Sequence, residues 1–328
     1  MKAILWTAYG PPDVLKPGEV EMVIPRDNEV LIRVHAATVS AGDVEARGMQ
    51  FPLLLAAAMR IFAGLTRPKR IRVLGQELSG EVVGAGSRVT RFKPGDRVYG
   101  TTGFGFGAYA EYICLPEASE DSVLAIIPDE LDYIQAATLP TGGLEALHFL
   151  RQGELKPGDQ VLVNGAGGSI GSFAVQLAKL SGADVTGVDR ADKLDRVLSL
   201  GADHVINYAV VDFSKQEQKY DVVLDVVGKR SFGRSVRALK PNGRYLLANP
   251  RLSSSLRGAW VGLTSGKKVL SKVAGRSPED LDYLGNLCAS GKIKPVIDKI
   301  FPFEQTAEAH RYVETGQKQG NVVILVES

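Results

Sequence analysis

The chain has 328 residues, 45% hydrophobic and 23% charged, which excludes a disordered protein and predicts two folded domains. Thirty-nine Lys and Arg residues against 37 Asp and Glu leave a formal net charge of +2, which argues against a nucleic-acid binder. Two cysteines, Cys114 and Cys288, exclude a disulfide framework. Since the start also lacks the apolar core of a signal peptide, we expect a cytoplasmic protein.

The first part of the chain has the pattern of β structure. Residues 30–40 alternate apolar and polar side chains, and further strand-like runs follow at 79–89, 96–100 and 107–115. Between them, residues 51–65 (FPLLLAAAMRIFAGL) predict a mostly apolar helix. This helix could belong to the core or form a lid over a substrate pocket. Its apolar run is too short to span a membrane.

From residue 126 to about 270, strands alternate with helices. The expected strands are 161–165, 184–189, 204–208 and 220–228, and the expected helices include 172–182 and 191–201. This alternation predicts a doubly wound parallel sheet covered by helices on both faces, and hence an α/β fold.

The last residues change character again. Helical patterns at 281–291 and 306–316 precede a strand-like end, NVVILVES. A terminal strand needs a sheet, so we expect it to return to the N-terminal β domain. That domain is then discontinuous, with residues 1–125 and 271–328 on either side of a domain formed by 126–270.

A basic stretch lies between residues 251 and 276, with six Lys or Arg and no Asp or Glu. We interpret it as a solvated face whose apolar side packs on the protein. Contact with a membrane surface or a phosphate remains the alternative.

The segment VLVNGAGGSIG (161–171) predicts a dinucleotide-binding turn between a strand and a helix. A register starting at Gly165 fails, because Ile170 then occupies the third glycine position. A register starting at Ala166 places glycine at 168 and 171. Gly168 then allows phosphate to approach the backbone, and Gly171 allows the helix to pack on the strand. Gly167 and Gly168, with the N–H groups of Ser169 and Ile170, are the expected pyrophosphate site.

Eighteen residues beyond Gly171, the strand 184–189 ends in Asp189. An acid at this position can bind the ribose hydroxyls of NAD. A simple strand-to-helix turn with a surface aspartate is the competing interpretation, and the complete context argues against it.

The chain resembles the medium-chain dehydrogenase/reductase superfamily, and within it the zinc-free quinone oxidoreductase-like branch. The resemblance covers nearly the whole chain and rests on MKAILWTAYGPPDVL, RFKPGDRVYG, GAYAEY, LKPGDQVLVNGAGGSIG, LGADHVINY, YDVVLDVVG, GKIKPVIDKIFPF and QGNVVILV. It implies a GroES-like β domain around a Rossmann domain, with the active site in the cleft between them. Relatives often dimerise through the edges of their Rossmann sheets, so we expect a homodimer.

In zinc-dependent relatives, a cysteine and a histidine bind the catalytic metal. The matching positions here hold Ser40 and Gln76, neither of which is a usual zinc ligand. We therefore expect no metal. Without a Lewis acid, conjugated acceptors such as quinones or α,β-unsaturated carbonyls suit hydride transfer better than isolated ketones.

The resemblance places three candidate catalytic residues near the nicotinamide. Ser40 and Asp43 occupy the Asn-x-x-Asp positions of quinone reductases, with serine in place of asparagine, and Thr141 lies in PTGGLEAL. Cap and turn roles are the alternative for these side chains. Tyr99, Tyr109 and Tyr112 are possible proton donors, and the sequence does not distinguish among them.

The coenzyme preference rests on conflicting residues. Asp189 favours NAD, because its charge would repel a 2′-phosphate. Lys193 and Tyr208 match positions that hold this phosphate in NADPH-dependent quinone reductases, and Arg190 adds a second cation. We favour NADP(H) slightly, with NAD(H) possible. Val227, Gly320 and Asn321 complete the expected coenzyme-binding residues.

The sequence thus predicts an NAD(P)H-dependent, zinc-independent reductase of a quinone, enal or enone. Two alternatives stay open. One is a coenzyme-binding sensor or regulatory protein with little turnover, and the other is a zinc-free reductase similar to alcohol dehydrogenases.

Overall fold

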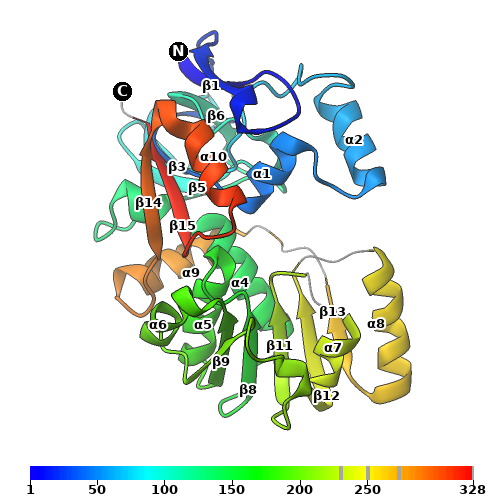
Figure 1. The fold of residues 1–328 in the computed structure, drawn as a ribbon. Coiled ribbons are helices and arrows are strands. Elements are labelled where there is room, and N and C mark those ends of the chain that lie inside the picture. The colour runs from blue at the N-terminus through cyan, green and yellow to red at the C-terminus, as the bar shows by residue number, and fades with distance from the viewer. Residues whose placement is uncertain (229–231, 249–251, 272–274, 276, 327–328) are drawn as a thin grey trace. The chain divides into compact units, whose positions relative to one another are not determined.

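The computed structural model describes the chain except residues 229–231, 249–251, 272–274, 276 and 327–328. It divides into two compact units (Figure 1). The first contains Met1–Thr141, Arg276–Ser290 and Pro295–Ser328, and the second contains Gly142–Gly275 and Gly291–Lys294.

A seven-stranded sheet forms the body of the first unit. Its strands follow the order β14-β15-β3-β4-β5-β7, with β6 paired to β3, and all pairs are antiparallel except β14 with β15. The strands are β3 (Glu29–Thr38), β4 (Glu77–Ala85), β5 (Arg97–Thr101), β6 (Tyr112–Pro116), β7 (Val123–Ile126), β14 (Ile297–Pro302) and β15 (Asn321–Leu325).

Shorter elements surround this sheet. The strands β1 (Lys2–Trp6) and β2 (Leu15–Glu19) form an antiparallel ribbon. The helices of the unit are α1 (Ala41–Gly48), α2 (Leu53–Ala63), α3 (Tyr133–Ala137), α9 (Pro278–Ala289) and α10 (Thr306–Glu314).

The C-terminal strand returns to the sheet built by the start of the chain. In the antiparallel pair of β15 with β3, Val323 lies opposite Thr38 and Leu325 opposite Ala36. This is the return that the strand-like chain end predicts. It makes the first unit discontinuous in sequence.

The unit boundaries differ from the expected ones. The expected break at 125/126 falls inside β7, which is held in the first sheet by its pairing with β5. Helix α3 also packs on β3 and β4, so the first unit continues to Thr141, inside α4 (Pro140–Gln152). A later return, Gly291–Lys294, joins the second unit, where the backbone of Lys294 exchanges two hydrogen bonds with the side-chain amide of Gln176.

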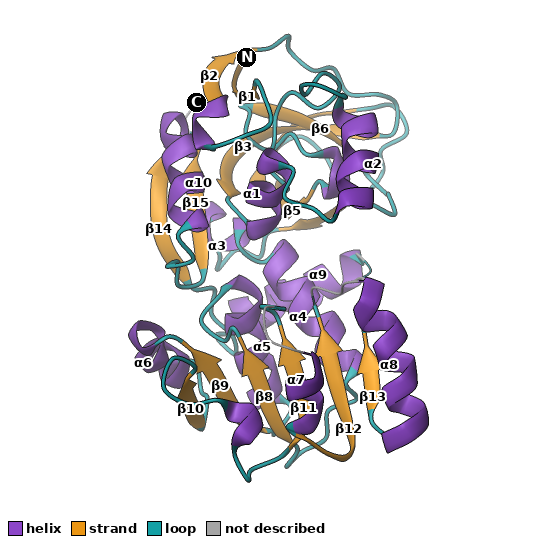
Figure 2. Cartoon of the chain, turned by 45° about the vertical axis from the view of Figure 1, so that its right-hand side comes forward, coloured by secondary structure: helices purple, strands orange, loops and turns teal. Residues whose placement is uncertain are grey.

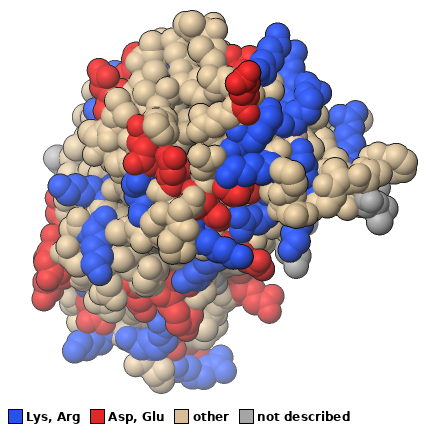
Figure 3. All heavy atoms as spheres, turned by 90° about the horizontal axis from the view of Figure 1, so that it is seen from below, with Lys and Arg blue, Asp and Glu red and all other residues tan. Residues whose placement is uncertain are grey.

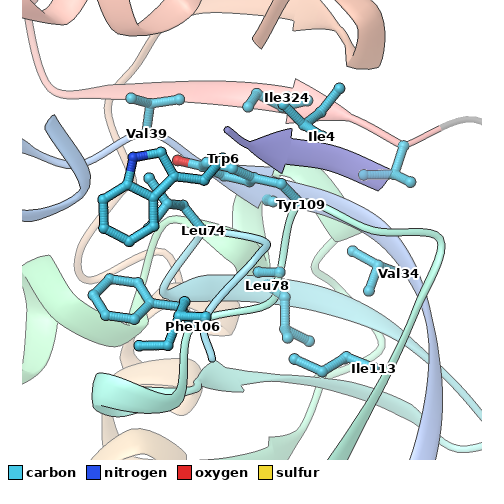
Figure 4. Close-up of a cluster of buried hydrophobic side chains, with 14 of the residues drawn as sticks. Ile4, Trp6, Val34, Val39, Leu74, Leu78, Phe106, Tyr109, Ile113 and Ile324 are labelled. Carbon is cyan, nitrogen blue, oxygen red and sulfur yellow. The ribbon is translucent and has the colours of Figure 1, made fainter. Parts of the chain in front are cut away.

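Alternating apolar residues of several strands build the core of the first unit. Val30, Ile32 and Val34 of β3 are fully buried, as period-two alternation predicts. Figure 4 shows that side chains distant in sequence meet there, among them Trp6, Leu74, Tyr109 and Ile324.

The second unit is a six-stranded, fully parallel sheet of order β10-β9-β8-β11-β12-β13. This is the strand order of a doubly wound dinucleotide-binding fold. Figure 2 shows the arrows running in one direction between helices. The strands are β8 (Gln160–Asn164), β9 (Asp184–Asp189), β10 (His204–Asn207), β11 (Tyr220–Asp225), β12 (Leu239–Leu247) and β13 (Lys268–Leu270), and the further helices are α5 (Ser169–Leu180), α6 (Ala191–Ser199), α7 (Phe232–Arg237) and α8 (Leu252–Ser265).

Positively and negatively charged side chains both occur on the surface. Figure 3 shows Lys and Arg side chains interspersed with Asp and Glu over the visible face, in keeping with the net charge of +2. None of the described helices has the length and apolar character needed to cross a bilayer. The basic stretch 251–276 contains α8 and β13, while its residues 251, 272–274 and 276 lie outside the described residues.

Candidate functional site

The glycine-rich turn, residues 165–171, lies at the carboxyl end of β8 and leads directly into α5. Gly165 has φ +91°, a conformation that favours glycine. Gly168 is the N-cap of α5, so this 12-residue helix begins without a side-chain cap. Backbone N–H groups at such a terminus favour an anionic ligand.

The two glycines of the Ala166 register have different surroundings. A Cβ atom on Gly171 would lie 2.0 Å from the carbonyl oxygen of Gly165, so only glycine lets α5 pack this closely on the turn. A Cβ on Gly168 would have its nearest neighbour, the same oxygen, at 3.5 Å. The space above Gly168 is therefore open, and the turn fits a pyrophosphate that approaches the backbone.

Asp189, at the end of β9, is tied into this turn. Its Oδ2 accepts a hydrogen bond from the N–H of Gly167 at 2.8 Å, and its Oδ1 accepts one from the N–H of Arg190 at 2.8 Å. Lys193 Nζ lies 3.8 Å from Asp189 Oδ1, and both side chains are less than 10% exposed. Asp189 is thus a buried, paired carboxylate that fixes the turn.

Around Asp189, the structure brings together the other side chains expected to select the coenzyme. Arg190 is partly exposed and pairs with Asp192, with 3.1 Å between Nε and Oδ1. Tyr208 follows β10, its N–H donates to the carbonyl oxygen of Asp189, and its side chain is exposed. The role of these residues in selecting the coenzyme stays a prediction.

On the other side of the turn, Val227 approaches Gly165. A Cβ on Gly165 would lie 2.7 Å from Val227 Cγ2. The N–H groups of Val227 and Gly228 donate to Asp225 Oδ1 at 3.1 and 3.0 Å. Val227 therefore lies beside the glycine turn, and its part in coenzyme binding stays a prediction.

Asp225 itself was not predicted. This fully buried carboxylate ends β11 and also accepts hydrogen bonds from Asn164 Nδ2 at 2.8 Å and Tyr245 Oη at 2.9 Å. It joins the carboxyl ends of three strands beneath the turn. A polar residue ending each of two strands is the signal that could have found it.

In the first unit, Ser40 and Asp43 form a capping box at the start of α1. Asp43 Oδ2 accepts hydrogen bonds from Ser40 Oγ at 2.6 Å and from Ser40 N–H at 2.9 Å, and Ser40 Oγ accepts one from Asp43 N–H at 3.1 Å. Asp43 is fully buried, and burial raises the pKa of its carboxyl to about 7. The pair caps the helix, and the raised pKa makes the Asp43 carboxyl a candidate proton donor.

A second buried carboxylate, Glu77, connects β4 with Thr141. Its Oε1 accepts a hydrogen bond from Thr141 N–H at 2.7 Å, and its Oε2 accepts one from Thr38 Oγ1. Burial raises the pKa of Glu77 as well, and its charge is one of the causes that raise the pKa of Asp43. Asp43 and Glu77 therefore form a buried acidic pair, and Thr141 is hydrogen-bonded to its Glu77 member.

Tyr109 lies beside these two acids. Its Oη donates to the carbonyl oxygen of Thr38 at 3.0 Å and lies 3.2 Å from Nε2 of the buried His310 of α10. Burial, followed by the charges of Asp43 and Glu77, holds the pKa of Tyr109 well above its usual value. Gly75 lets the ring approach, because a Cβ there would lie 2.6 Å from Tyr109 Cδ1.

The three tyrosines considered as proton donors have different partners. Tyr99 Oη donates to the carbonyl oxygen of Leu281 at 2.7 Å and ties α9 to β5. Tyr112 begins β6 and is half-buried. Of the three, Tyr109 is the one placed against Asp43 and Glu77.

The residues at the zinc-ligand positions of related enzymes do not fit a zinc ion. Ser40 Oγ is engaged by Asp43, and Gln76 Nε2 donates to the carbonyl oxygen of Gly103 at 3.0 Å. Among the described residues, no three His, Cys, Asp or Glu side chains gather as a metal site requires.

Gly320 and Asn321 lie at the start of β15, in the first unit. Gly320 has φ +87°, and a Cβ there would lie 2.4 Å from the carbonyl oxygen of Val296. The side chain and N–H of Asn321 both donate to that oxygen. The described contacts give both residues a role in holding β15, and their part in coenzyme binding stays a prediction.

Comparison with known proteins identifies the family. Residues 26–128 match the model for the alcohol dehydrogenase GroES-like domain, and residues 200–324 match the model for zinc-binding dehydrogenase. The chloroplastic NADPH-dependent alkenal/one oxidoreductase of Arabidopsis thaliana is 34% identical, over 99% of this chain and 79% of the relative. The chain belongs to the medium-chain dehydrogenase/reductase superfamily.

Solved structures place it in the quinone oxidoreductase-like branch of that superfamily. The quinone oxidoreductase from Coxiella burnetii has a TM-score of 0.89 and 33% identity, covering 100% of this chain and 99% of that one. The Escherichia coli quinone oxidoreductase complexed with NADPH has a TM-score of 0.82 and 26% identity, covering 99% and 100%. The expected superfamily and the GroES-like plus Rossmann fold are confirmed.

Proposed function

We propose that this protein is an NAD(P)H-dependent oxidoreductase that reduces quinones or α,β-unsaturated carbonyls without zinc. The observation that carries the proposal is the open glycine turn before the uncapped N-terminus of α5. Relatives support the reaction class, since the Arabidopsis protein is named for alkenals and alkenones and the Coxiella protein for quinones. When bound, the coenzyme would supply the hydride.

In the second unit, residues 165–171 would hold the coenzyme. The N–H groups at the start of α5 would face the pyrophosphate, and Gly168 would allow its approach. Asp189 supports this turn through the N–H of Gly167, and Asp225 supports the neighbouring Val227 through its N–H. A turn held by a buried carboxylate keeps its shape before the ligand arrives, which lowers the ordering cost of binding.

In the first unit, Ser40 and Asp43 would supply the proton. When Asp43 is protonated, its hydroxyl can donate to Ser40 Oγ, and the Ser40 hydroxyl is then released to donate to a developing oxyanion. Because a pKa of about 7 leaves a large protonated fraction near neutral pH, Asp43 is suited to general acid catalysis. A conjugated substrate needs only this hydrogen bond at its oxygen, and no Lewis acid.

The arrangement at Asp189 favours NADPH. An acid that selects NADH must offer its oxygens to the ribose, whereas both oxygens of Asp189 are engaged by backbone N–H groups and Lys193 balances its charge. Arg190 and the exposed Tyr208 would be available to a 2′-phosphate at that strand end. We infer that NADPH binds more tightly than NADH.

The test uses the purified full chain with each coenzyme and three acceptors: a 1,4-quinone, a 2-enal and an isolated ketone. We expect loss of reduced coenzyme with the quinone or the enal, and faster with NADPH than with NADH. Turnover confined to the ketone would contradict the proposal. Coenzyme binding without turnover on any acceptor would favour a sensor instead.

We also expect the protein to act in the cytoplasm and as a homodimer. The absence of a disulfide framework supports the compartment. The edge strands β10 and β13 of the parallel sheet offer backbone groups for pairing with a second copy.

A further inference from the structure

Helix α2 carries an apolar surface that its own unit does not cover. Of its 11 residues, Arg60 is the single charged one. A narrow stripe, Met59 and Ala63, packs into the core of the first unit. The other side points to solvent, with Leu53 85%, Ile61 67% and Leu65, just after the helix, 70% exposed. Helices on the surface of a globular protein normally carry polar side chains on that side.

This helix lies inside a part of the chain that carries charge of only one sign. Between Glu45 and Glu77 there is no Asp or Glu, while six Lys and Arg residues occur. Four of the six follow α2 in the segment 64–72 and are exposed: Arg67, Lys69, Arg70 and Arg72. Within the described part of the chain, none of these four pairs with a carboxylate.

The backbone brings these cations to the end of the helix. Gly64, with φ +142°, turns the chain, and a Cβ there would lie 2.1 Å from the carbonyl oxygen of Arg67. The N–H groups of Lys69 and Arg70 both donate to the carbonyl oxygen of Ala63, at 2.8 and 3.1 Å. The basic segment therefore folds back on the C-terminus of α2.

A pocket of about 370 Å³ opens between this segment and β1. It is lined by Leu5, Trp6, Thr7, Arg67, Pro68, Lys69 and Arg72, so three cations and an aromatic ring line it and no acid does. The N–H of Trp6 donates to the carbonyl oxygen of Arg72 at 2.7 Å, which fixes one wall. Its charge suits a phosphate-bearing head group.

We propose that residues 53–72, with this pocket, form a docking surface for an anionic lipid bilayer. A bilayer surface offers acyl chains for the apolar side of α2 and anionic head groups for the cations beside it. A purely apolar protein partner would leave the four cations unbalanced. An 11-residue helix is about 16 Å long and lies in the interface plane instead of spanning the membrane. The inference does not depend on the reductase activity.

The experiment is co-sedimentation of the full chain with vesicles, without coenzyme. One set of vesicles is phosphatidylcholine, and the other is an equal mixture with phosphatidylglycerol. We expect roughly tenfold stronger partitioning onto the anionic vesicles, weakening as salt is added. Equal binding to both sets, or none to either, would overturn the proposal.

Two groups of variants separate the apolar and charged contributions. Leu53→Ser with Ile61→Ser should abolish partitioning, and Arg67→Gln with Lys69→Gln should remove the preference for anionic vesicles. Matched controls are Ile24→Ser, 83% exposed elsewhere in the unit, and Arg88→Gln; neither should change binding. Loss of a dimer in the serine variant, without vesicle binding by the parent chain, would assign α2 to a protein interface and reject the bilayer.

Discussion

At the scale of single residues, the first unit holds two acids in an environment that disfavours their charge. Asp43 and Glu77 are both buried, and burial is the largest cause of the raised pKa of each. Asp43 keeps its hydrogen bonds to Ser40 at the rim of this cluster. The Asp43 carboxyl therefore caps the helix, and we propose that it is also the proton source.

The rate of the proposed reaction should follow the protonation of Asp43. Because the protonated carboxyl is the donor, kcat should be level below about pH 7 and fall as pH rises through the pKa of about 7. Asp43→Asn should lower kcat about a hundredfold and remove this pH dependence. The measurement is a pH–rate profile with NADPH and a quinone. Ser40→Ala is the companion variant, expected to lower kcat while the Asp43 carboxyl remains. An unchanged profile in Asp43→Asn would reject the role.

At the scale of elements, the N-terminus of α5 is the decisive feature. Its N-cap, Gly168, has φ −87°, a conformation open to any residue. The helix therefore does not need glycine at this position. A bound phosphate, in contrast, requires the open space above Gly168. A substitution at this position can therefore change coenzyme binding without lowering the stability of the helix.

Gly168→Asp should weaken coenzyme binding and leave the fold intact. An aspartate N-cap stabilises a helix by a few tenths of a kcal/mol relative to glycine, so the melting temperature should stay level or rise. Its carboxylate would repel the pyrophosphate and raise the Kd for NADPH by at least about tenfold. Titration calorimetry and thermal melting test both parts. Gly105→Asp, with no neighbour within 4 Å of the added Cβ, controls for charge alone. Equal Kd values for Gly168→Asp and the parent chain would contradict the assignment.

At the scale of the whole molecule, stability should depend on acid through buried groups that join distant parts of the chain. His310 of α10 contacts Tyr109, and burial lowers the pKa of His310 to about 3. Arg47 of α1, which is also buried, forms an ion pair with Glu314 at the end of α10. These contacts attach the C-terminal part of the first unit to its N-terminal part.

The free energy of unfolding should fall as pH drops from about 6.5 towards 3. In that range an unfolded histidine binds a proton that His310 does not accept in the folded chain, so protons favour unfolding. The contribution is about 1.4 kcal/mol per pH unit inside this window. Denaturant unfolding of the parent chain and of His310→Gln, at about pH 7 and about pH 5, measures it. The variant should be less stable at pH 7 and less sensitive to acid. Identical pH slopes would show that His310 does not contribute.

The sequence by itself determined the features that depend on near neighbours. Strand alternation, the strand–helix rhythm of the second unit and the Ala166, Gly168 and Gly171 register follow from spacing within a few residues, and the fold class is confirmed. The tertiary structure alone decided what depends on long-range contacts. It joined Asp189 to the glycine turn, placed Tyr109 against Asp43 and His310, and showed that β7 belongs to the first sheet. The physical reason is that burial and partners set the chemistry of a carboxyl or a phenol. Two of these partners, Gly167 for Asp189 and His310 for Tyr109, lie 22 and 201 residues away along the chain.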